Sequence, residues 1–405
     1  MPFRLPGRTS PLLALFLTLL CAPVAAETRS ELTLEAILGS PDLSGPRLRA
    51  PRLDPTGSRV TFLRGRPEDR DLLDLWEYHR GLGVTRRLIA ADDVLPGPVD
   101  LSPEERARRE RERIADLRGI VDYLWGPDGR RILFPLGGDL YLADVSEEPV
   151  TVRPLTAGED FDRDPKLSPD GRRVAFVRDQ DLWVVDVESG ETEALTRDGE
   201  GTVSNGVAEF IAQEEMGRST GYWWSPDSRR IAFLQVDTAP VPATRRYEID
   251  AEEIRIVEQR YPFAGGPNVK IRLGVIEVES GEIRWVDLGG DDVYVPRVEW
   301  TSDPDALSFQ VQSRDQRRLE LVLQRLGDGC APDCRRVLVT ETSETWINLH
   351  DDLHFLDGEA AFVWSSERSG HRHLYLFGLD GKLIRPLTAG DWSVGQLSAV
   401  DEALG

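Results

Sequence analysis

The 405-residue sequence has only three cysteines, and this scarcity excludes a small disulfide-rich scaffold. Cys21 lies near the N-terminus, and Cys330 and Cys334 lie in one short loop. We expect a local disulfide between the latter two in an oxidising compartment. Free thiols and half of a zinc site are the alternatives, although no second Cys or His pair follows at a spacing suited to zinc.

The sequence also lacks an excess of positive charge. Lys and Arg number 49 against 71 Asp and Glu, which gives a formal net charge of −22. Binding to nucleic acid phosphates or to anionic lipid needs a basic surface, so we expect neither nucleic acid nor membrane as a partner. The hydrophobic share of 40%, with ten Trp, is too high for a disordered acidic chain.

Long apolar runs are absent beyond the N-terminus, where one run of nine residues is too short to span a bilayer. Arg4 and Arg8 precede this run, Leu12–Leu20, and the small residues Val24–Ala26 follow it. This order is typical of a secretory signal peptide, which we assign to residues 1–26. We therefore expect a periplasmic or secreted protein, with an uncleaved anchor as the alternative.

A short motif recurs along the mature region, residues 27–405. It consists of a Trp or Leu, a turn of the type Pro-Asp-Gly and a strand rich in Val, Ile and Phe, and its copies are Leu53–Phe62, Trp125–Phe134, Leu167–Phe176, Trp224–Phe233 and the weaker Trp300–Phe309 and Leu356–Trp364. Pro fixes φ in such a turn, and Gly accepts positive φ.

The spacing of the copies predicts the fold class. Pro127 and Pro169 lie 42 residues apart, with two or more short strands between them, which is typical of propeller blades. We predict an all-β protein, a β-propeller with about seven blades in an incomplete ring. A two-sheet sandwich is the alternative, and the number of copies disfavours it.

Two segments break the β pattern and predict short helical insertions. In residues 102–118, Ser102 is a suitable N-cap, and Glu105 can complete a capping box and pair with Arg109. The second segment, residues 205–217, ends at Gly217, which suits the residue after a helix. It falls where the repeat interval lengthens to 57 residues, between Pro169 and Pro226.

Glu214 and Glu215 are the sharpest candidate for chemistry. On a helical turn, neighbouring side chains diverge by only about 100°, so two carboxylates can converge on one cation. When two carboxylates are held close together, the pKa of one of them rises unless a cation lies between them. A substrate ammonium could be that cation. On these grounds alone the pair is a weak signal, and a solvated helix face is the favoured interpretation.

The long run Glu209–Phe233 resembles the dipeptidyl peptidase IV branch of the prolyl oligopeptidase family, and the resemblance extends over roughly residues 50–405. The other segments that carry it are Asp237–Pro242, Val257–Val269, Trp346–Leu356 and Ser366–Leu376. The resemblance implies an eight-bladed propeller joined to an α/β-hydrolase domain.

The family's functional residues are expected at three positions. A tandem Glu pair that holds the free amine of a peptide corresponds to Glu214 and Glu215. An arginine of the basic helix that helps to bind the substrate backbone corresponds to Arg113, with Arg109 and Arg111 as fallbacks. The implied partners are peptides with a free N-terminus, a hydrolase domain and, in one reading, a second copy in a homodimer.

The sequence departs from this family in one large respect. It contains no Gly-x-Ser-x-Gly nucleophile motif. The catalytic Asp and His that the family has downstream of this motif are missing as well. We therefore assign no catalytic residue, and Ser225, Ser366 and His371 are not candidates. We expect the chain to stop before the hydrolase domain and to be inactive alone.

The histidines raise a metal hypothesis, because four of the five lie within residues 350–373. We instead expect ordinary strand and loop histidines, with neither metal nor cofactor. Two further function classes stay open: a non-catalytic interaction propeller similar to TolB, and a propeller glycosidase, for which we find no characteristic turns.

Overall fold

The computed structural model describes residues 32–39, 43, 45, 47–158, 160–249, 251–327, 334–358 and 360–402. The predicted signal peptide and Cys330 lie outside these residues. The chain divides into two compact units, residues 1–45 and 46–405. In the first unit, α1 (Leu34–Leu38) begins after Thr33, whose hydroxyl oxygen accepts a hydrogen bond from the Ala36 amide at 3.1 Å.

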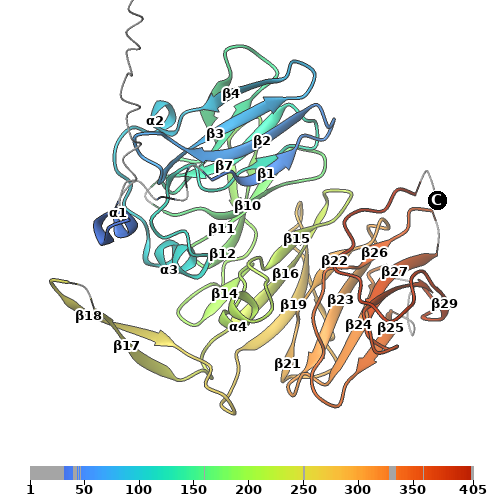
Figure 1. Cartoon of the computed structure of the whole chain (residues 1–405). Helices are drawn as coiled ribbons and strands as arrows, with labels where there is room; N and C mark the ends of the chain where they lie inside the picture. The colour runs from blue at the N-terminus through green and yellow to red at the C-terminus, as the bar shows by residue number, and fades with distance from the viewer. Residues whose placement is uncertain are drawn as a thin grey trace, which may run out of the picture. The chain divides into compact units, whose positions relative to one another are not determined.

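The second unit contains six sheets of four or five strands within the described residues, numbered here as blades 1 to 6 in chain order (Figure 1). Blade 1 comprises β1 (Arg49–Leu53), β2 (Arg59–Gly65), β3 (Leu72–His79), β4 (Val84–Ile89) and the parallel β5 (Arg118–Gly119). Blade 2 comprises β6 (Leu124–Trp125), β7 (Arg131–Leu136), β8 (Asp139–Asp144) and β9 (Thr151–Pro154). Blade 3 comprises β10 (Arg163–Leu167), β11 (Arg173–Arg178), β12 (Asp181–Asp186) and β13 (Thr192–Ala194).

The last three blades follow the same antiparallel order. Blade 4 comprises β14 (Val203–Asn205), β15 (Tyr222–Trp224), β16 (Arg230–Asp237), β19 (Lys270–Glu277) and β20 (Ile283–Val286). Blade 5 comprises β21 (Val293–Tyr294), β22 (Val298–Trp300), β23 (Ala306–Ser313), β24 (Arg318–Arg325) and β25 (Arg335–Thr342). Blade 6 comprises β26 (His354–Phe355), β27 (Ala361–Ser366), β28 (His373–Gly378) and β29 (Leu383–Pro386). A seventh sheet is the two-stranded ribbon β17 (Ala243–Ile249) and β18 (Ile254–Arg260).

The recurring turn leads directly into a strand, as its sequence predicts: β2, β7, β11 and β16 follow it in blades 1 to 4. Gly129 and Gly171 take φ values of 64° and 68°, and Ser228 takes 63° at the same position. The amide of each closes the turn on a carbonyl three residues earlier, as in the bond from Gly171 N to Ser168 O at 2.8 Å. Only glycine adopts this conformation without strain, so Ser228 is the least favourable copy.

Hydrophobic cores lie between successive blades, because the central strands bury both faces. Ile132 and Phe134 of β7 belong to the cluster shared with blade 1, whereas Leu133 belongs to the cluster shared with blade 3. Three further clusters join blades 3 and 4, 4 and 5, and 5 and 6. Apolar runs such as residues 231–234 therefore replace the polar alternation of a half-solvated sheet.

The tryptophans that open three copies of the motif join neighbouring blades. Each indole N–H donates to a residue of the preceding blade, pairing Trp125 with Thr61 Oγ1 (2.8 Å), Trp224 with Lys166 O (3.1 Å) and Trp300 with Trp223 O (3.0 Å). The three indoles are half-buried, and their N–H groups find partners across the boundary, so the residue that marks the motif also contributes to the contact between blades.

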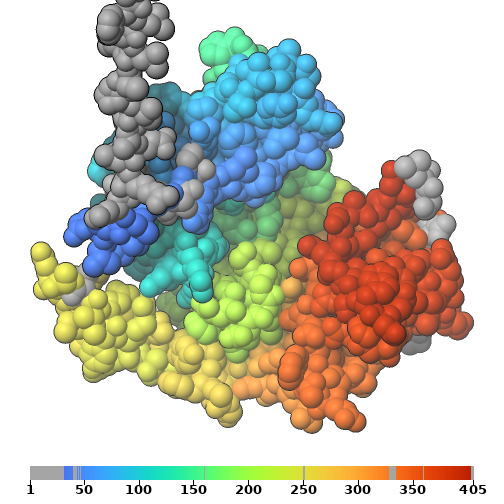
Figure 2. Space-filling model, in the orientation of Figure 1, coloured from blue at the N-terminus to red at the C-terminus, as the bar shows by residue number. Residues whose placement is uncertain are grey.

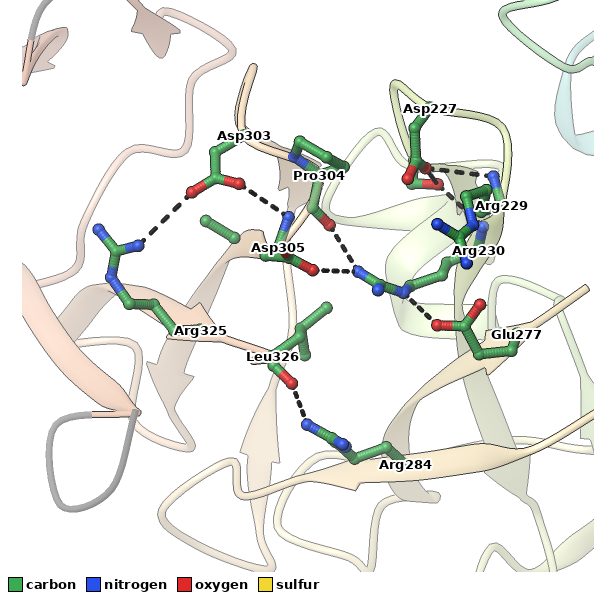
Figure 3. Close-up of polar contacts among 12 residues, drawn as sticks. Asp227, Arg229, Arg230, Glu277, Arg284, Asp303, Pro304, Asp305, Arg325 and Leu326 are labelled. Atoms are coloured by element: carbon green, nitrogen blue, oxygen red, sulfur yellow. Dashed lines mark hydrogen bonds and ion pairs between the residues drawn. The ribbon is translucent and has the colours of Figure 1, made fainter. Parts of the chain in front are cut away.

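Arginines make further contacts between blades 4 and 5 (Figure 3). Arg230 Nη1 donates to Pro304 O at 3.0 Å and to Asp305 Oδ1 at 2.7 Å, and its Nε pairs with Glu277 of its own blade. Arg284 donates to Leu326 O across the same boundary. These bonds link blade 4 to two loops of blade 5.

Three insertions interrupt this pattern and carry the candidate site. The helices α2 (Ala91–Val94) and α3 (Pro103–Arg111) lie between β4 and β5 of blade 1. The helix α4 (Phe210–Glu214) lies between β14 and β15, which both pair with β16. The ribbon β17–β18 leaves blade 4 between β16 and β19.

Candidate functional site

The helix α4 carries the Glu pair and is shorter than the predicted segment of residues 205–217. Asn205 still belongs to β14, and the buried Glu209 caps the helix, its carboxylate accepting a hydrogen bond from the Ala212 amide at 2.9 Å. At the other end Gly217 takes φ of 62°, which fits the chain reversal expected there. The insertion closes on itself through a β-bridge between Val207 and Thr220.

Glu214 is the last residue of α4, and Glu215 is its C-cap. Both side chains are exposed. The Glu214 carboxylate lies 3.4 Å from Arg111 Nε, and Gln213 Oε1 accepts a hydrogen bond from Arg111 Nη1 at 3.1 Å. The tandem acids therefore lie on one edge of a helical turn, with a cation beside one of them.

The helix α3 supplies that cation. Ser102 caps it as predicted, its hydroxyl oxygen accepting from the Glu105 amide at 3.1 Å. The Glu105 side chain binds Arg108 and Arg109 instead of completing a capping box. The helix ends at Arg111, earlier than the predicted range of residues 102–118, because Arg113 takes φ of 57° and leaves the helical path.

The three predicted arginines have different environments. Arg109 is buried, pairs with Glu105 at 2.7 Å and donates to Leu117 O at 2.8 Å, which is a structural role. Arg111 contacts Glu214 and lies over the Phe210 ring, 5.7 Å from its centroid. Arg113 is exposed, and among the described residues its side chain makes no hydrogen bond or ion pair with Glu214 or Glu215. The structure thus brings Arg111, one of the two fallbacks, to the Glu pair.

A cavity of about 2540 Å³ lies next to these helices in the second unit. The lining includes residues of α3, of α4 and of the first strands of several blades, among them Arg111, Phe210, Gln213, Trp223, Glu299 and Trp300. Figure 2 shows α3 in teal and α4 in yellow-green as neighbouring parts of one face. Glu214, Glu215 and Arg113 are not among the described residues that line the cavity, although Arg111 and Gln213 beside them are.

Burial changes the ionisation of several groups around α4. Loss of hydration raises the pKa of Glu209, and the nearby charge of Arg218 only partly opposes it. Burial also lowers the pKa of Arg218 to about 10. Neither residue was a candidate from the sequence. Glu209 lies directly before the helix and caps it, a role that the usual Ser, Thr, Asp or Asn pattern misses.

The histidines have structural partners. The ring nitrogens of His373 lie 3.0 Å from Thr388 Oγ1 and 3.0 Å from Gly390 O, and the His350 ring packs edge-on against Trp364. Across the described residues, no group of three or more His, Cys, Asp or Glu is placed to hold a metal ion. Cys334 is disulfide-bonded, and its predicted partner Cys330 lies outside the described residues.

The helices α1 to α4 are short, with four to nine residues each. In the part of the chain that the structure describes, none of them combines the length and the apolar character needed to cross a bilayer.

The fold and the inserted helices define a β-propeller protein whose inner strands and insertions surround a large cavity. Residues 126–405 match the family model described as Dipeptidyl peptidase IV (DPP IV) N-terminal region. The chain belongs to this family, as its resemblance predicts.

Individual relatives agree with this assignment. Dipeptidyl peptidase 4 of Arthroderma otae is 27% identical over 227 residues, which cover 53% of this chain and 29% of that protein. Human dipeptidyl peptidase 8 is 29% identical over 334 residues, which cover 68% of this chain and 37% of that protein. The chain therefore spans about a third of the length of these curated relatives.

A solved structure confirms the fold. The crystal structure of Porphyromonas gingivalis dipeptidyl peptidase 4 superposes with a TM-score of 0.69 at 24% identity, covering 88% of this chain and 49% of that one. The predicted all-β propeller class is thereby confirmed.

Proposed function

We propose that this chain is the substrate-gating propeller of an exported dipeptidyl aminopeptidase, a serine-type enzyme that releases dipeptides ending in Pro or Ala. The proposal rests on one observation above all: Glu214 and Glu215 are adjacent on a short inserted helix, beside Arg111 and the cavity. The 405-residue chain supplies recognition in this proposal, and its sequence offers no nucleophile motif for the cleavage step.

The chemistry of the pair suits a peptide N-terminus. A free α-amine has a pKa of about 8 and is mostly charged at neutral pH. One carboxylate at 4 Å attracts it by about 1 kcal/mol in water and about 4 kcal/mol at the effective dielectric near a protein surface. Two carboxylates that fix the amine also fix which carbonyl of the peptide reaches a nucleophile, which is catalysis by positioning.

An arginine beside the pair would align the peptide backbone. The contacts of Arg111 with Glu214 and Gln213 favour this residue for the role, whereas the resemblance points to Arg113. Substituting Arg111 and Arg113 separately with Met distinguishes the two residues, because only the loss of the functional arginine should weaken peptide binding. Loss of binding in Arg113→Met alone would return the role to that residue.

Calorimetry on the purified chain tests the Glu pair. We expect the dipeptide Gly-Pro to bind about tenfold or more tightly than N-acetyl-Gly-Pro, and the double variant Glu214→Gln/Glu215→Gln to lose the difference. Equal affinity of the two peptides for the unaltered chain would contradict the proposal and favour a non-catalytic interaction propeller. Glu110→Gln, an exposed acid on α3, is the matched control.

Export is the second part of the proposal and has its own measurement. A cleaved signal peptide predicts that the mature protein begins at Glu27 and is recovered from the periplasm or the medium. Sequencing of the N-terminus of the protein from each cell fraction decides this point.

A further inference from the structure

The position of the Glu pair is set from outside its own helix. The helix α4 has only five residues, and a helix this short is not stable by itself. Glu209 holds its first turn, as described above. The C-terminal end, which bears Glu214 and Glu215, needs a separate restraint, and the contacts of the next residue, Met216, show where it comes from.

Arg297 of blade 5 provides this restraint. Its Nη1 donates to Met216 O at 2.8 Å and to Pro296 O at 2.9 Å, and its Nε pairs with Asp351, which precedes blade 6. The Arg297 side chain is only 20% exposed. Its carbonyl accepts a hydrogen bond from the Gln310 amide at 2.9 Å, so the residue itself is held by its own blade.

Three parts of the propeller therefore meet at one guanidinium. The carbonyl that it binds belongs to the residue directly after the Glu pair, at the end of α4. Arg297 does not line the cavity within the described part of the chain, whereas its neighbours Val298 and Glu299 do. Its side-chain bonds in the described part of the chain go to Met216 O, Pro296 O and Asp351, so it contacts the backbone that carries the carboxylates and not the carboxylates themselves.

We propose that Arg297 is a positioning residue that fixes Glu214 and Glu215 for a peptide amine by holding the carbonyl of Met216. This inference rests on the proposed function for the identity of the ligand, but the restraint itself does not. Because the planar guanidinium holds Met216 and Asp351 together, Lys is expected to replace it only in part.

The experiment combines two measurements on the full chain. The first is the ratio of the affinities for Gly-Pro and N-acetyl-Gly-Pro, measured by calorimetry. The second is hydrogen–deuterium exchange of the amides of residues 210–216. Arg297→Met should lower the affinity ratio about tenfold and raise the exchange in this segment, and Arg297→Lys should restore part of both.

Arg284→Met is the matched control. Arg284 also donates to a carbonyl across the boundary between blades 4 and 5, at Leu326, but far from α4 in the sequence and outside the insertion (Figure 3). This variant should leave the affinity ratio and the exchange of residues 210–216 as in the unaltered chain. If Arg297→Met fails to fold, Asp351→Asn removes the ion pair instead and should act in the same direction.

The outcomes separate the two proposals. An unaltered ratio and unaltered exchange in Arg297→Met would overturn the positioning role, as would equal effects of Arg284→Met. If the unaltered chain does not distinguish the two peptides, the proposed function fails. The exchange measurement then still decides whether Arg297 restrains the helix.

Discussion

Among single residues, Glu299 on the cavity wall has an altered ionisation. Its side chain reaches the water of the cavity, but the surrounding protein limits its hydration and raises its pKa to about 7. The charge of His354 opposes this increase, and the negative charge of Asp351 adds to it. The wall therefore gains a negative charge as the pH passes neutrality, in the same cavity that Gln213 of α4 lines.

This shift predicts how stability depends on pH. The unfolded chain ionises Glu299 near pH 4.5, whereas the folded chain retains the proton up to about pH 7. Stability from this group is therefore lost as the pH rises between these values. The variant Glu299→Gln is neutral at every pH. Its thermal stability relative to the unaltered chain should rise as the pH increases from 4.5 to about 7, and this difference should stay constant at higher pH. A difference in melting temperature that is constant from pH 4.5 to above 7 would contradict the prediction.

Among the elements, the neck of the α4 insertion depends on one glycine. Gly221 follows the bridge residue Thr220, and a Cβ atom there would lie 2.3 Å from the backbone carbonyl carbon of Val207. The two strands of the neck can approach each other only because this position has no side chain. The neck in turn sets where the insertion projects from blade 4.

Gly221→Ala should therefore force the neck apart. We expect the free energy of unfolding to fall by about 1–3 kcal/mol, as in other overpacked sites, when measured by urea denaturation. Gly395→Ala is the control, because a Cβ at Gly395 meets nothing within 4 Å and its φ is ordinary. Equal stability of the two variants would show that the neck has room to adjust.

At the scale of the whole second unit, stability comes from the boundaries between blades. Each of the five core clusters of described residues draws on two successive sheets, so no blade buries its apolar faces alone. Tryptophan indoles and arginines add directional bonds at the edges of these cores. Loss of one bond should weaken the boundary that it crosses.

Arg230 offers the clearest test of this idea, since it contacts both Pro304 O and Asp305 across the boundary between blades 4 and 5 (Figure 3). Arg230→Met should lower the free energy of unfolding by about 1–3 kcal/mol, because the hydrogen bonds of a charged group are lost. Arg229→Met changes the adjacent, exposed arginine of the same turn and should have little effect. Urea denaturation of both variants makes the comparison, and a similar loss in each would argue against a specific contact.

Much of the fold could be predicted because the repeated turn depends on local conformation. The motif around Pro169 and Gly171 requires a fixed φ and a positive φ, and its spacing predicts propeller blades. Helix ends were harder to predict: Glu209 caps α4 from a buried position, and Arg113 leaves the helical path. Both depend on what surrounds the segment and not on its own residues.

The sequence by itself determined the blade pattern, the family and the tandem acids, because turn chemistry, hydrophobic strands and adjacent residues are local properties. Only the tertiary structure decided that Arg111 meets Glu214, and that Arg297 holds the end of α4. These contacts join residues from different blades and insertions, about a hundred positions apart in the case of Arg111 and Gln213. Their partners are set by how the sheets pack together, which no local pattern encodes.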